Sequence, residues 1–436
     1  MQQTYECVTR ELVTHECARC SGQRAAESKY TLTVYNVHMT RVQQENRRQA
    51  SGELFPTDEP IPASQMIGRS EDMRQVAGAL ENGTSLVMAG PRRTGKTSVC
   101  DAALSKVRAR GVYVAAVDLF EMADDAELAE TLAGAVLRNR PALRKLLPKA
   151  RRLGRQALTA AQGAVVMQLK SQLGDAVELA LTPGLASQNP QRALAQALEL
   201  PQRVAVADGR RCVVFFDEFQ ELAGERRPYG DPDAVTKRMR AIFQRSTQVS
   251  YLFTGSLEHV MRDLFAPGDR ALSGFGSFYH LRPIAPEEWG EGLRERFAAD
   301  NCEIAQDALA RLVTLGEGHP RVTMLIAQQV HFLSVLLGVR KIDGPLVEQG
   351  YDNAYHGDSA LLDQLLEQIR SSHRQALKIA RRVAVGATLT EGMHRGDADR
   401  ALRKLQEAGM IERTGHGAYR ILNPLLRRRL IEQRVL

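Results

Sequence analysis

The sequence predicts an α/β fold in which a parallel β-sheet is flanked by helices. Short apolar runs of strand length alternate with longer stretches of helical periodicity, which is the pattern of strands joined by crossover helices. One of these runs stops at a glycine-rich loop and another stops at an Asp-Glu pair, and both endings carry chemistry. At 436 residues the chain has room for two or three domains.

The composition favours an ordinary globular protein. Hydrophobic residues make up 44% of the chain and charged residues 25%. No window approaches the length of uncharged apolar sequence that a membrane span needs, so we expect no transmembrane helix. The N-terminus lacks an apolar core of signal-peptide type, and we therefore expect a cytoplasmic protein.

Residues 1–60 are polar and mixed in character and end in the linker-like stretch FPTDEPIPAS, so we expect a disordered N-terminal extension. Four of its side chains could hold zinc: Cys7, His15, Cys17 and Cys20. Because their spacing is irregular, the alternative is a reduced tail that binds no metal. A further alternative is that the native protein starts at Met39 or Met66. The other cysteines stand in apolar surroundings and indicate core positions: Cys100, Cys212 and Cys302.

The ordered part is expected to begin near Met66 with a helix that Ser70 caps. The apolar residues of this helix share one face: Met73, Val76, Ala77 and Leu80. The first strand is the apolar run just before the glycine-rich loop, and four more strands are expected to begin at Gly111, Cys212, Val249 and Ser277. Residues 121–205 are mostly helical in pattern and form a helical insert.

The glycine-rich loop reads G-x-x-x-x-G-K-T within SLVMAGPRRTGKTS, which is the P-loop pattern. Glycine allows backbone conformations in which several N–H groups turn inward around a phosphate, and the following helix adds the positive end of its dipole. Lys96 can reach the β- and γ-phosphates of ATP, and the Thr97 hydroxyl can bind Mg²⁺. The loop is therefore the expected nucleotide cradle: Gly90, Pro91, Arg92, Arg93, Thr94, Gly95, Lys96, Thr97 and Ser98.

The third expected strand, CVVFFDEF, supplies a second half of the nucleotide site. Apolar residues lead into Asp217, so we expect its carboxylate at the carboxyl end of the strand, where it can hold Mg²⁺ across from Thr97. Glu218 follows and can polarise an attacking water. The alternative is that both acidic residues cap the next helix, and the P-loop upstream favours the catalytic interpretation.

The fourth expected strand ends in Thr254, Gly255 and Ser256. A polar side chain at this tip can touch the γ-phosphate or the attacking water, so Thr254 and Ser256 are candidate catalytic residues. An N-cap for a helix over residues 257–264 is the alternative role for either of them.

A basic stretch lies inside the helical insert. Residues 138–155 carry eight basic side chains and no acidic one, and their leucines recur at helical spacing. This pattern predicts a helix with an apolar inner face and a solvated basic outer face, and contact with nucleic acid or an acidic protein partner is the alternative.

Together these motifs resemble an AAA+-type P-loop ATPase, and more narrowly the archaeal-ATPase group of the signal-transducing, STAND-like branch. The similarity spans residues 66 to about 325 and is carried by IGRSEDM, MAGPRRTGKTS, VVFFDEFQEL, YLFTGSLEHVM, LRPIAPEEW and EGHPRVTML. The resemblance implies the strand order 5-1-4-3-2, with the fourth strand between the P-loop strand and the Asp-Glu strand. It also implies that Ile67, Gly68 and Arg69 line the adenine and ribose, and that the later helices form a lid.

The implied lid contains Gly318, His319, Pro320 and Arg321. A Gly-x-Pro at a helix start is a STAND-like feature, although proline is also common in any first helical turn. Arg321 stands where AAA+ relatives place a sensor arginine on the γ-phosphate. Relatives often carry Tyr-Gly-Arg near the fifth strand, where this chain has ALSGFGSFYH. The identity of an arginine finger is therefore left open. A neighbouring subunit could supply it, and this chain offers three candidates: Arg262, Arg270 and Arg282.

Residues 369–436 resemble a winged helix, with two helices, two strand-like runs around Gly415 and Gly417, and a final helix. From Arg370 to the end, 15 Lys and Arg face 6 Asp and Glu, a balance of +9 that exceeds the +7 of the whole chain. We expect this region to contact double-stranded DNA, with protein contact or autoinhibition as the alternative. The candidate contact residues are Arg400, Arg403, Lys404, Arg413, His416 and Arg427–Arg429.

The expected domains are a P-loop ATPase core over residues 61–285, a helical lid over 286–368 and a winged helix over 369–436. The expected function is Mg²⁺-dependent ATP hydrolysis that drives a switch coupled to the winged helix. Two alternatives stay open. One is a nucleotide-gated DNA-binding regulator with little turnover, and the other is a signalling scaffold that forms homo-oligomers on ATP and holds a protein partner through the helical insert.

Overall fold

The structure is a computed structural model that describes residues 49–57, 60–144, 146–153, 160–223, 231–415 and 417–433. All of these residues belong to one unit of the chain, Arg41–Leu436. The four candidate zinc ligands of the N-terminal extension lie outside the described residues, and so does His416 of the expected wing.

A five-stranded parallel sheet forms the centre of the fold. Its strand order is β2-β3-β4-β1-β5, which confirms the predicted order read from the other edge. The strands are β1 (Leu86–Ala89), β2 (Tyr113–Asp118), β3 (Cys212–Asp217), β4 (Val249–Gly255) and β5 (Ser277–Phe278). In register, Met88 pairs with Thr254 and Asp118 with Asp217. Because the strands are parallel, the P-loop, Asp217 and the end of β4 meet at one edge of the sheet.

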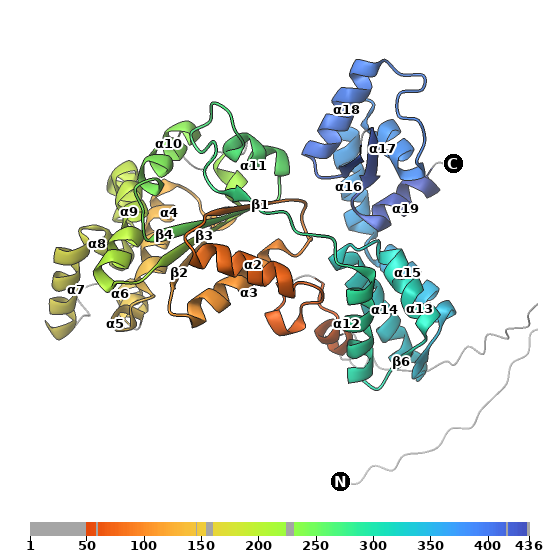
Figure 1. The fold of residues 1–436 in the computed structure, drawn as a ribbon, viewed down its shortest axis with the longest axis horizontal. Coiled ribbons are helices and arrows are strands. Elements are labelled where there is room, and N and C mark those ends of the chain that lie inside the picture. The colour runs from red at the N-terminus through yellow and green to blue at the C-terminus, as the bar shows by residue number, and fades with distance from the viewer. Residues whose placement is uncertain are drawn as a thin grey trace, which may run out of the picture. The chain divides into compact units, whose positions relative to one another are not determined.

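Helices cover both faces of the sheet (Figure 1). Side chains that alternate along the strands pack against these helices. Met88 and Phe215 point to the face covered by α2 (Ser70–Glu81) and α3 (Lys96–Ala109). Val87 and Phe216 point to the opposite face, which is covered by four helices: α4 (Asp125–Leu137), α9 (Pro190–Asp208), α10 (Pro232–Phe243) and α11 (Glu258–Phe265). Cys100 and Cys212 are fully buried in these two cores, as expected.

The start of α2 differs from the expectation. The predicted N-cap at Ser70 is wrong, because the helix begins at Ser70 itself and Arg69 occupies the N-cap position without a capping side-chain bond. Glu71 and Asp72 supply negative charge in the first turn, which favours the positive end of the helix dipole. The predicted apolar face is confirmed, since all four of its residues are buried: Met73, Val76, Ala77 and Leu80.

The insert between β2 and β3 is helical, as expected. Besides α4 and α9 it contains α5 (Pro141–Arg144), α6 (Leu146–Leu153), α7 (Ala160–Leu173) and α8 (Ala176–Leu181). In its basic stretch Leu143 and Leu147 are buried, which agrees with an apolar inner face. Arg140 makes an ion pair with Asp208 of α9 at 2.6 Å, so this arginine serves the insert's own structure.

The part of the chain after β5 is mostly helical. It comprises α12 (Pro286–Ala299), α13 (Gln306–Gly316), α14 (Pro320–Leu337), α15 (Gly344–Gly357), α16 (Ser359–Ser372), α17 (Ala376–Val385), α18 (Arg395–Glu407) and α19 (Pro424–Glu432). Two short strands, β6 (Glu303–Ile304) and β7 (Lys341–Ile342), pair in parallel, and β8 (Ile411–Gly415) and β9 (Ala418–Ile421) form an antiparallel hairpin. Helices α17 and α18 with this hairpin agree with the expected order of elements, and their assignment as a winged helix stays a prediction.

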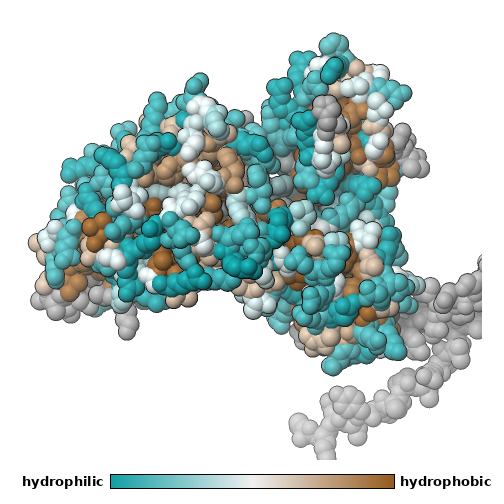
Figure 2. All heavy atoms as spheres, viewed as in Figure 1, coloured by the Kyte–Doolittle hydropathy of each residue, from teal (hydrophilic) through white to brown (hydrophobic). Residues whose placement is uncertain are grey.

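Hydrophobic residues lie in scattered patches between hydrophilic ones on the face drawn in Figure 2. Among the described residues, no helix combines the length and the apolar character needed to cross a membrane.

Candidate functional site

A pocket of about 390 Å³ opens next to the P-loop. This volume is within the range of roughly 300–1,000 Å³ that is usual for small-molecule sites. Five segments far apart in the sequence line it, namely the residues before α2, the P-loop, the end of β3, the start of α12 and the start of α14. The predicted site residues in its lining are Ile67, Arg69, Arg92, Arg93, Thr94, Gly95, Lys96, Thr97, Ser98, Glu218, Pro320 and Arg321.

Six predicted site residues do not line this pocket: Gly68, Gly90, Pro91, Asp217, Thr254 and Ser256. Gly90, Pro91 and Ser256 line a second cavity, which shares four residues with the first: Arg69, Thr94, Lys96 and Pro320. At Gly68 a Cβ atom would lie 2.5 Å from Cγ2 of Ile284, so its backbone packs closely against the segment before α12.

The P-loop winds tightly into the first turn of α3. Gly95 holds the N-cap position with φ of 87°, a left-handed conformation that favours glycine. Arg93 also has a positive φ, 65°, which is uncommon for a side chain of its size. The first N–H groups of α3 have no partner within the helix, so they and the helix dipole create an anion-binding end at the pocket.

Lys96 lies inside the loop. Its Nζ donates hydrogen bonds to the carbonyl oxygens of Gly90 at 2.7 Å and Pro91 at 2.6 Å, and the residue is only 8% exposed. Burial lowers the pKa of the Lys96 amine to about 8, and the nearby Glu218 and Asp217 carboxylates oppose that shift. A cation held with so little solvation is well suited to pair with phosphate.

The Asp217 carboxylate joins three elements. It accepts hydrogen bonds from the Thr97 hydroxyl at 3.2 Å, from the Thr254 hydroxyl, and from the backbone N–H of Glu218 at 2.9 Å. Thr97 and Asp217 thus lie side by side, as the sequence predicted, and offer the hard oxygen ligands that Mg²⁺ prefers. Thr254 reaches the site through Asp217.

Glu218 is held by a network at the ends of β3 and β4. One of its carboxylate oxygens accepts hydrogen bonds from the Ser256 hydroxyl at 2.9 Å and from the Gln220 side-chain amide. Gln220 is 1% exposed, and its side chain also bonds Ser256 through Nε2 at 3.3 Å and accepts from the Ser256 N–H at 3.1 Å. The spacing of residues gave no signal for Gln220, which reaches back because the turn η5 (Phe219–Leu222) follows Glu218 directly.

The polar residues at the ends of β3 and β4 do not cap the helices that follow them. Glu218 precedes η5 with φ of 49° and makes no side-chain cap bond to it. Leu257, not Ser256 or Thr254, occupies the N-cap position of α11. The polar residues at the ends of β3 and β4 therefore bond one another instead of the helix ends that follow.

Arg69 connects the segment before α2 to the P-loop. Its guanidinium donates to the Thr94 carbonyl at 3.3 Å, to the Arg282 carbonyl, and to the Asp72 carboxylate at 3.1 Å. Burial lowers the pKa of Arg69, and the Asp72 carboxylate partly offsets this effect. Asp72, which the sequence did not single out, also accepts from the Tyr279 hydroxyl at 2.8 Å. These bonds fix one wall of the pocket.

Arg321 reaches the pocket from the start of α14. Its guanidinium makes a two-pronged ion pair with Asp358, with bonds of 2.5 and 2.9 Å, and both side chains are about nine-tenths buried. His319 occupies the N-cap of α14 and accepts from the Val322 N–H at 3.3 Å. Burial and the Arg321 charge lower the pKa of His319 to about 4, so His319 is neutral near pH 7. No spacing in the sequence pointed to Asp358, which lies 37 residues from Arg321.

The other predicted P-loop side chains contact the protein. Arg92 Nε donates to the Ser256 hydroxyl at 3.4 Å, the Thr94 hydroxyl donates to the Pro91 carbonyl at 3.0 Å, and the Ser98 hydroxyl accepts from the Ile61 N–H at 3.1 Å.

The three candidate finger arginines have acidic neighbours in their own chain. Arg262 pairs with Glu258 at 2.7 Å, Arg270 pairs with Asp233 at 3.1 Å, and Arg282 lies 3.9 Å from Asp72. None of the three lines the pocket of about 390 Å³, but Arg262 and Arg282 line the second cavity together with Gly90, Pro91 and Lys96, and Arg270 lines neither.

Many basic side chains of residues 369–436 make ion pairs within the chain. The basic run near the C-terminus forms three ion pairs at 2.6–2.8 Å: Arg427 with Glu317, Arg428 with Asp352 and Arg429 with Asp363. These three arginines therefore stabilise the fold. On α18, Arg400 pairs with Asp397 at 2.7 Å and Lys404 with Glu407 at 2.7 Å, while Arg403 is exposed. Arg413 Nε bonds the Gly415 carbonyl at 3.0 Å.

Many solved structures are similar to this chain, among them the following two. A Walker-type ATPase of Pyrococcus abyssi aligns with a TM-score of 0.63 and 18% identity over 86% of this chain and 99% of that one. The ORC2 protein of Aeropyrum pernix, solved with ADPNP and ADP, aligns with a TM-score of 0.51 and 15% identity over 87% of this chain and 96% of that one. No family model and no curated protein matches the sequence. The chain therefore has a P-loop NTPase fold.

The lowered pKa of Lys96 predicts a pH dependence of stability. Between about pH 8 and 10.5 the folded amine has lost its proton while the unfolded amine still binds one, so the free energy of unfolding rises with pH in this window. We expect Lys96→Met to remove much of this rise. Urea unfolding at several pH values measures it, with Lys106→Met, an exposed lysine of the same helix, as the control. Equal pH slopes in all three proteins would contradict the burial of the Lys96 charge.

Proposed function

We propose that the chain binds ATP in the pocket at the P-loop and hydrolyses it to ADP and phosphate. The observation that carries this proposal is that Lys96, Glu218 and Arg321, from three distant segments, line one pocket whose floor is the N-terminal end of α3. Each has the chemistry that phosphoryl transfer needs: a cation for the phosphates, a carboxylate for water, and a second cation for developing charge.

In this proposal the triphosphate takes hydrogen bonds from the N–H groups of the P-loop and α3. Lys96 Nζ exchanges its bonds to the Gly90 and Pro91 carbonyls for bonds to phosphate oxygens. Thr97 and Asp217 fit Mg²⁺ by their donor atoms and hold it, and the bound ion would neutralise charge on the phosphates. Thr254 keeps Asp217 oriented through its hydroxyl.

Glu218 is the proposed base. A water oxygen attacks the γ-phosphorus, the bond from that phosphorus to the oxygen shared with the β-phosphate breaks, and Glu218 accepts the water's proton. Ser256 and Gln220 hold the Glu218 carboxylate, so it has to exchange at least one of these bonds for a bond to water. Ile67 and Arg69, which line the pocket, are the proposed wall for adenine and ribose, and Gly68 between them packs against Ile284. Pro320 helps to place Arg321 over the phosphates.

We also propose that the chain is related to the STAND-like branch of AAA+-type ATPases. On this view hydrolysis changes the contacts of the lid helices and moves the residues 369–436 that follow them. The Arg321–Asp358 pair supports such a coupling, because Asp358 directly precedes α16.

Two substitutions test the proposed hydrolysis. We expect Lys96→Ala to abolish ATP binding, because it removes the buried cation of the P-loop. Glu218→Gln should retain ATP binding and lower turnover by roughly 100- to 10,000-fold, the usual contribution of a general base. Phosphate release and ATP binding are measured separately, with Lys106→Ala as the control. Undiminished hydrolysis by Glu218→Gln would overturn the mechanism.

A second prediction concerns Asp358. If the γ-phosphate competes with Asp358 for the Arg321 guanidinium, Asp358→Asn should raise the affinity for ATP relative to ADP by about 10-fold, which is the scale of one charge-assisted hydrogen bond. Titration with both nucleotides measures this ratio. Asp363→Asn, on α16 just after Asp358 and paired with Arg429, is the matched control. An unchanged ATP-to-ADP ratio in Asp358→Asn would rule out contact between Arg321 and the γ-phosphate.

DNA binding by residues 369–436 is a second candidate function, favoured by the +9 charge balance of residues 370–436. It predicts salt-sensitive binding of double-stranded DNA that differs between ATP and ADP, because phosphate contacts release counterions. Since Arg403 is exposed on α18, Arg403→Ala should weaken binding and reduce the salt slope by about 1. Arg110→Ala, at the exposed C-cap of α3 and outside residues 369–436, is the control. No DNA binding at low salt in any nucleotide state would remove this function.

A further inference from the structure

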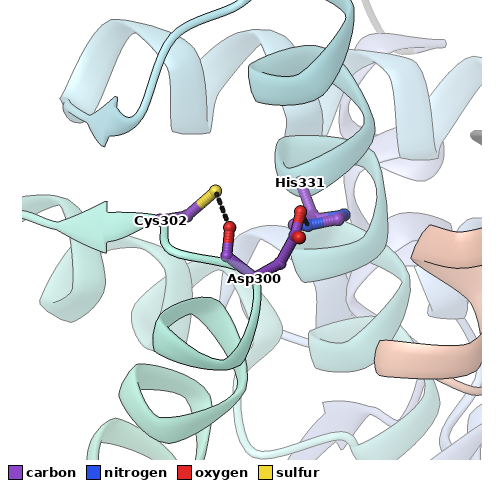
Figure 3. A group of neighbouring side chains, drawn as sticks. All are labelled: Asp300, Cys302 and His331. Carbon is purple, nitrogen blue, oxygen red and sulfur yellow. Dashed lines mark hydrogen bonds and ion pairs between the residues drawn. The ribbon is translucent and has the colours of Figure 1, made fainter.

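Three side chains with metal-binding atoms gather in the helical part after β5, away from the P-loop. They are Asp300, Cys302 and His331, whose ligand atoms all lie within 4.8 Å of one another (Figure 3). Within the described residues this is the one such group of three. None of these residues has a part in the proposed ATP site.

The local fold explains why they meet. Helix α12 ends at Ala299, and Asp300 is its C-cap. Asn301 has a left-handed φ of 55°, which asparagine tolerates better than most residues, and it turns the chain so that Cys302 N–H bonds back to the Phe297 carbonyl at 2.9 Å. His331 comes from the middle of α14, and Figure 3 shows its ring next to the Asp300 carboxylate, with Cys302 facing Asp300.

His331 has the surroundings of a metal-binding histidine. It is 1% exposed and packs beside the rings of Phe55 and Phe297, which also contact each other. Nε2 lies 3.0 Å from the Asp300 carboxylate and Nδ1 lies 2.9 Å from the Ser51 hydroxyl. Because a hydroxyl can accept as well as donate, Ser51 can take the Nδ1 proton and leave Nε2 free as a ligand.

Cys302 and Asp300 share a positively charged neighbour. Cys302 is 3% exposed, and its Sγ accepts a hydrogen bond from Arg340 Nη1 at 3.7 Å. The same nitrogen lies 3.5 Å from the Asp300 carboxylate, and the Arg340 side chain is 60% exposed at the rim. Arg340 thus contacts both the sulfur and the carboxylate, two kinds of ligand atom that zinc accepts.

We propose that Asp300, Cys302 and His331 bind one zinc ion. One soft thiolate, one borderline imidazole and one hard carboxylate form a mixed ligand set that zinc accepts, and the two negative charges match its double positive charge. The half-exposed Asp300 leaves a side open for water as the fourth ligand. The ion would clamp the turn between α12 and β6 onto α14. This inference does not depend on ATP hydrolysis.

The test uses the full chain with Cys7, Cys17 and Cys20 replaced by serine, which removes the thiol ligands of the N-terminal extension. Titration with Co²⁺ in the absence of nucleotide should give one bound equivalent with a thiolate-to-cobalt absorption band, which excess Zn²⁺ displaces. The oxygen ligands Thr97 and Asp217 cannot give this band. Cys302→Ala in the same background should lose it, and Cys212→Ala, another fully buried cysteine, should keep it.

Two further variants keep the test decisive if Cys302→Ala does not fold. Asp300→Asn, at a half-exposed position, should weaken Co²⁺ binding, and Ser51→Ala should weaken it by about 10- to 100-fold, the usual effect of losing the partner that orients a histidine ligand. If no thiolate band forms, or if the band survives Cys302→Ala, the proposal is wrong and the three residues form a hydrogen-bonded cluster without metal.

Discussion

The Asp217 carboxylate is the contact through which the parts of the candidate site hold one another in place. It lies at the carboxyl end of β3 and accepts hydrogen bonds from Thr97 on α3 and Thr254 on β4. These bonds require β4 to lie between the P-loop strand and β3, which is the observed strand order. A parallel sheet in this order brings the ends of β1, β3 and β4 to a common edge. Asp217 at this edge links α3, the helix after the P-loop, to β4.

Glu218, the neighbour of Asp217, is already hydrogen-bonded within the protein. One of its carboxylate oxygens accepts hydrogen bonds from Gln220 and Ser256. Lys96 is likewise bonded to the Gly90 and Pro91 carbonyls, and Arg321 to Asp358. In each case a ligand has to replace a bond within the protein, so nucleotide binding on the proposed scheme changes contacts in the core and in the lid together.

Much of this could be predicted from the sequence because it depends on local signals. The strands end at chemically distinct residues, the P-loop has fixed spacing, and a parallel sheet then determines which ends meet, so Thr97 and Asp217 were expected to be neighbours. Gln220 and Asp358 were missed because their roles arise from tertiary contacts, a tight turn after Glu218 and a contact across 37 residues. Ser70 was wrongly predicted as an N-cap because serine is common at that position. The helix in fact begins at Ser70, so the N-cap is Arg69. The Asp300, Cys302 and His331 group has no recognisable spacing either, since a single left-handed residue and a distant helix create it.

The central claim is that the P-loop pocket binds ATP with Lys96 on its phosphates. The most direct measurement is a structure of the full chain with Mg²⁺ and a non-hydrolysable ATP analogue. We expect the triphosphate at the N-terminal end of α3, with Lys96 Nζ moved from the Gly90 and Pro91 carbonyls to phosphate oxygens. A nucleotide bound elsewhere, or Lys96 still bonded to both carbonyls beside a bound nucleotide, would contradict the account.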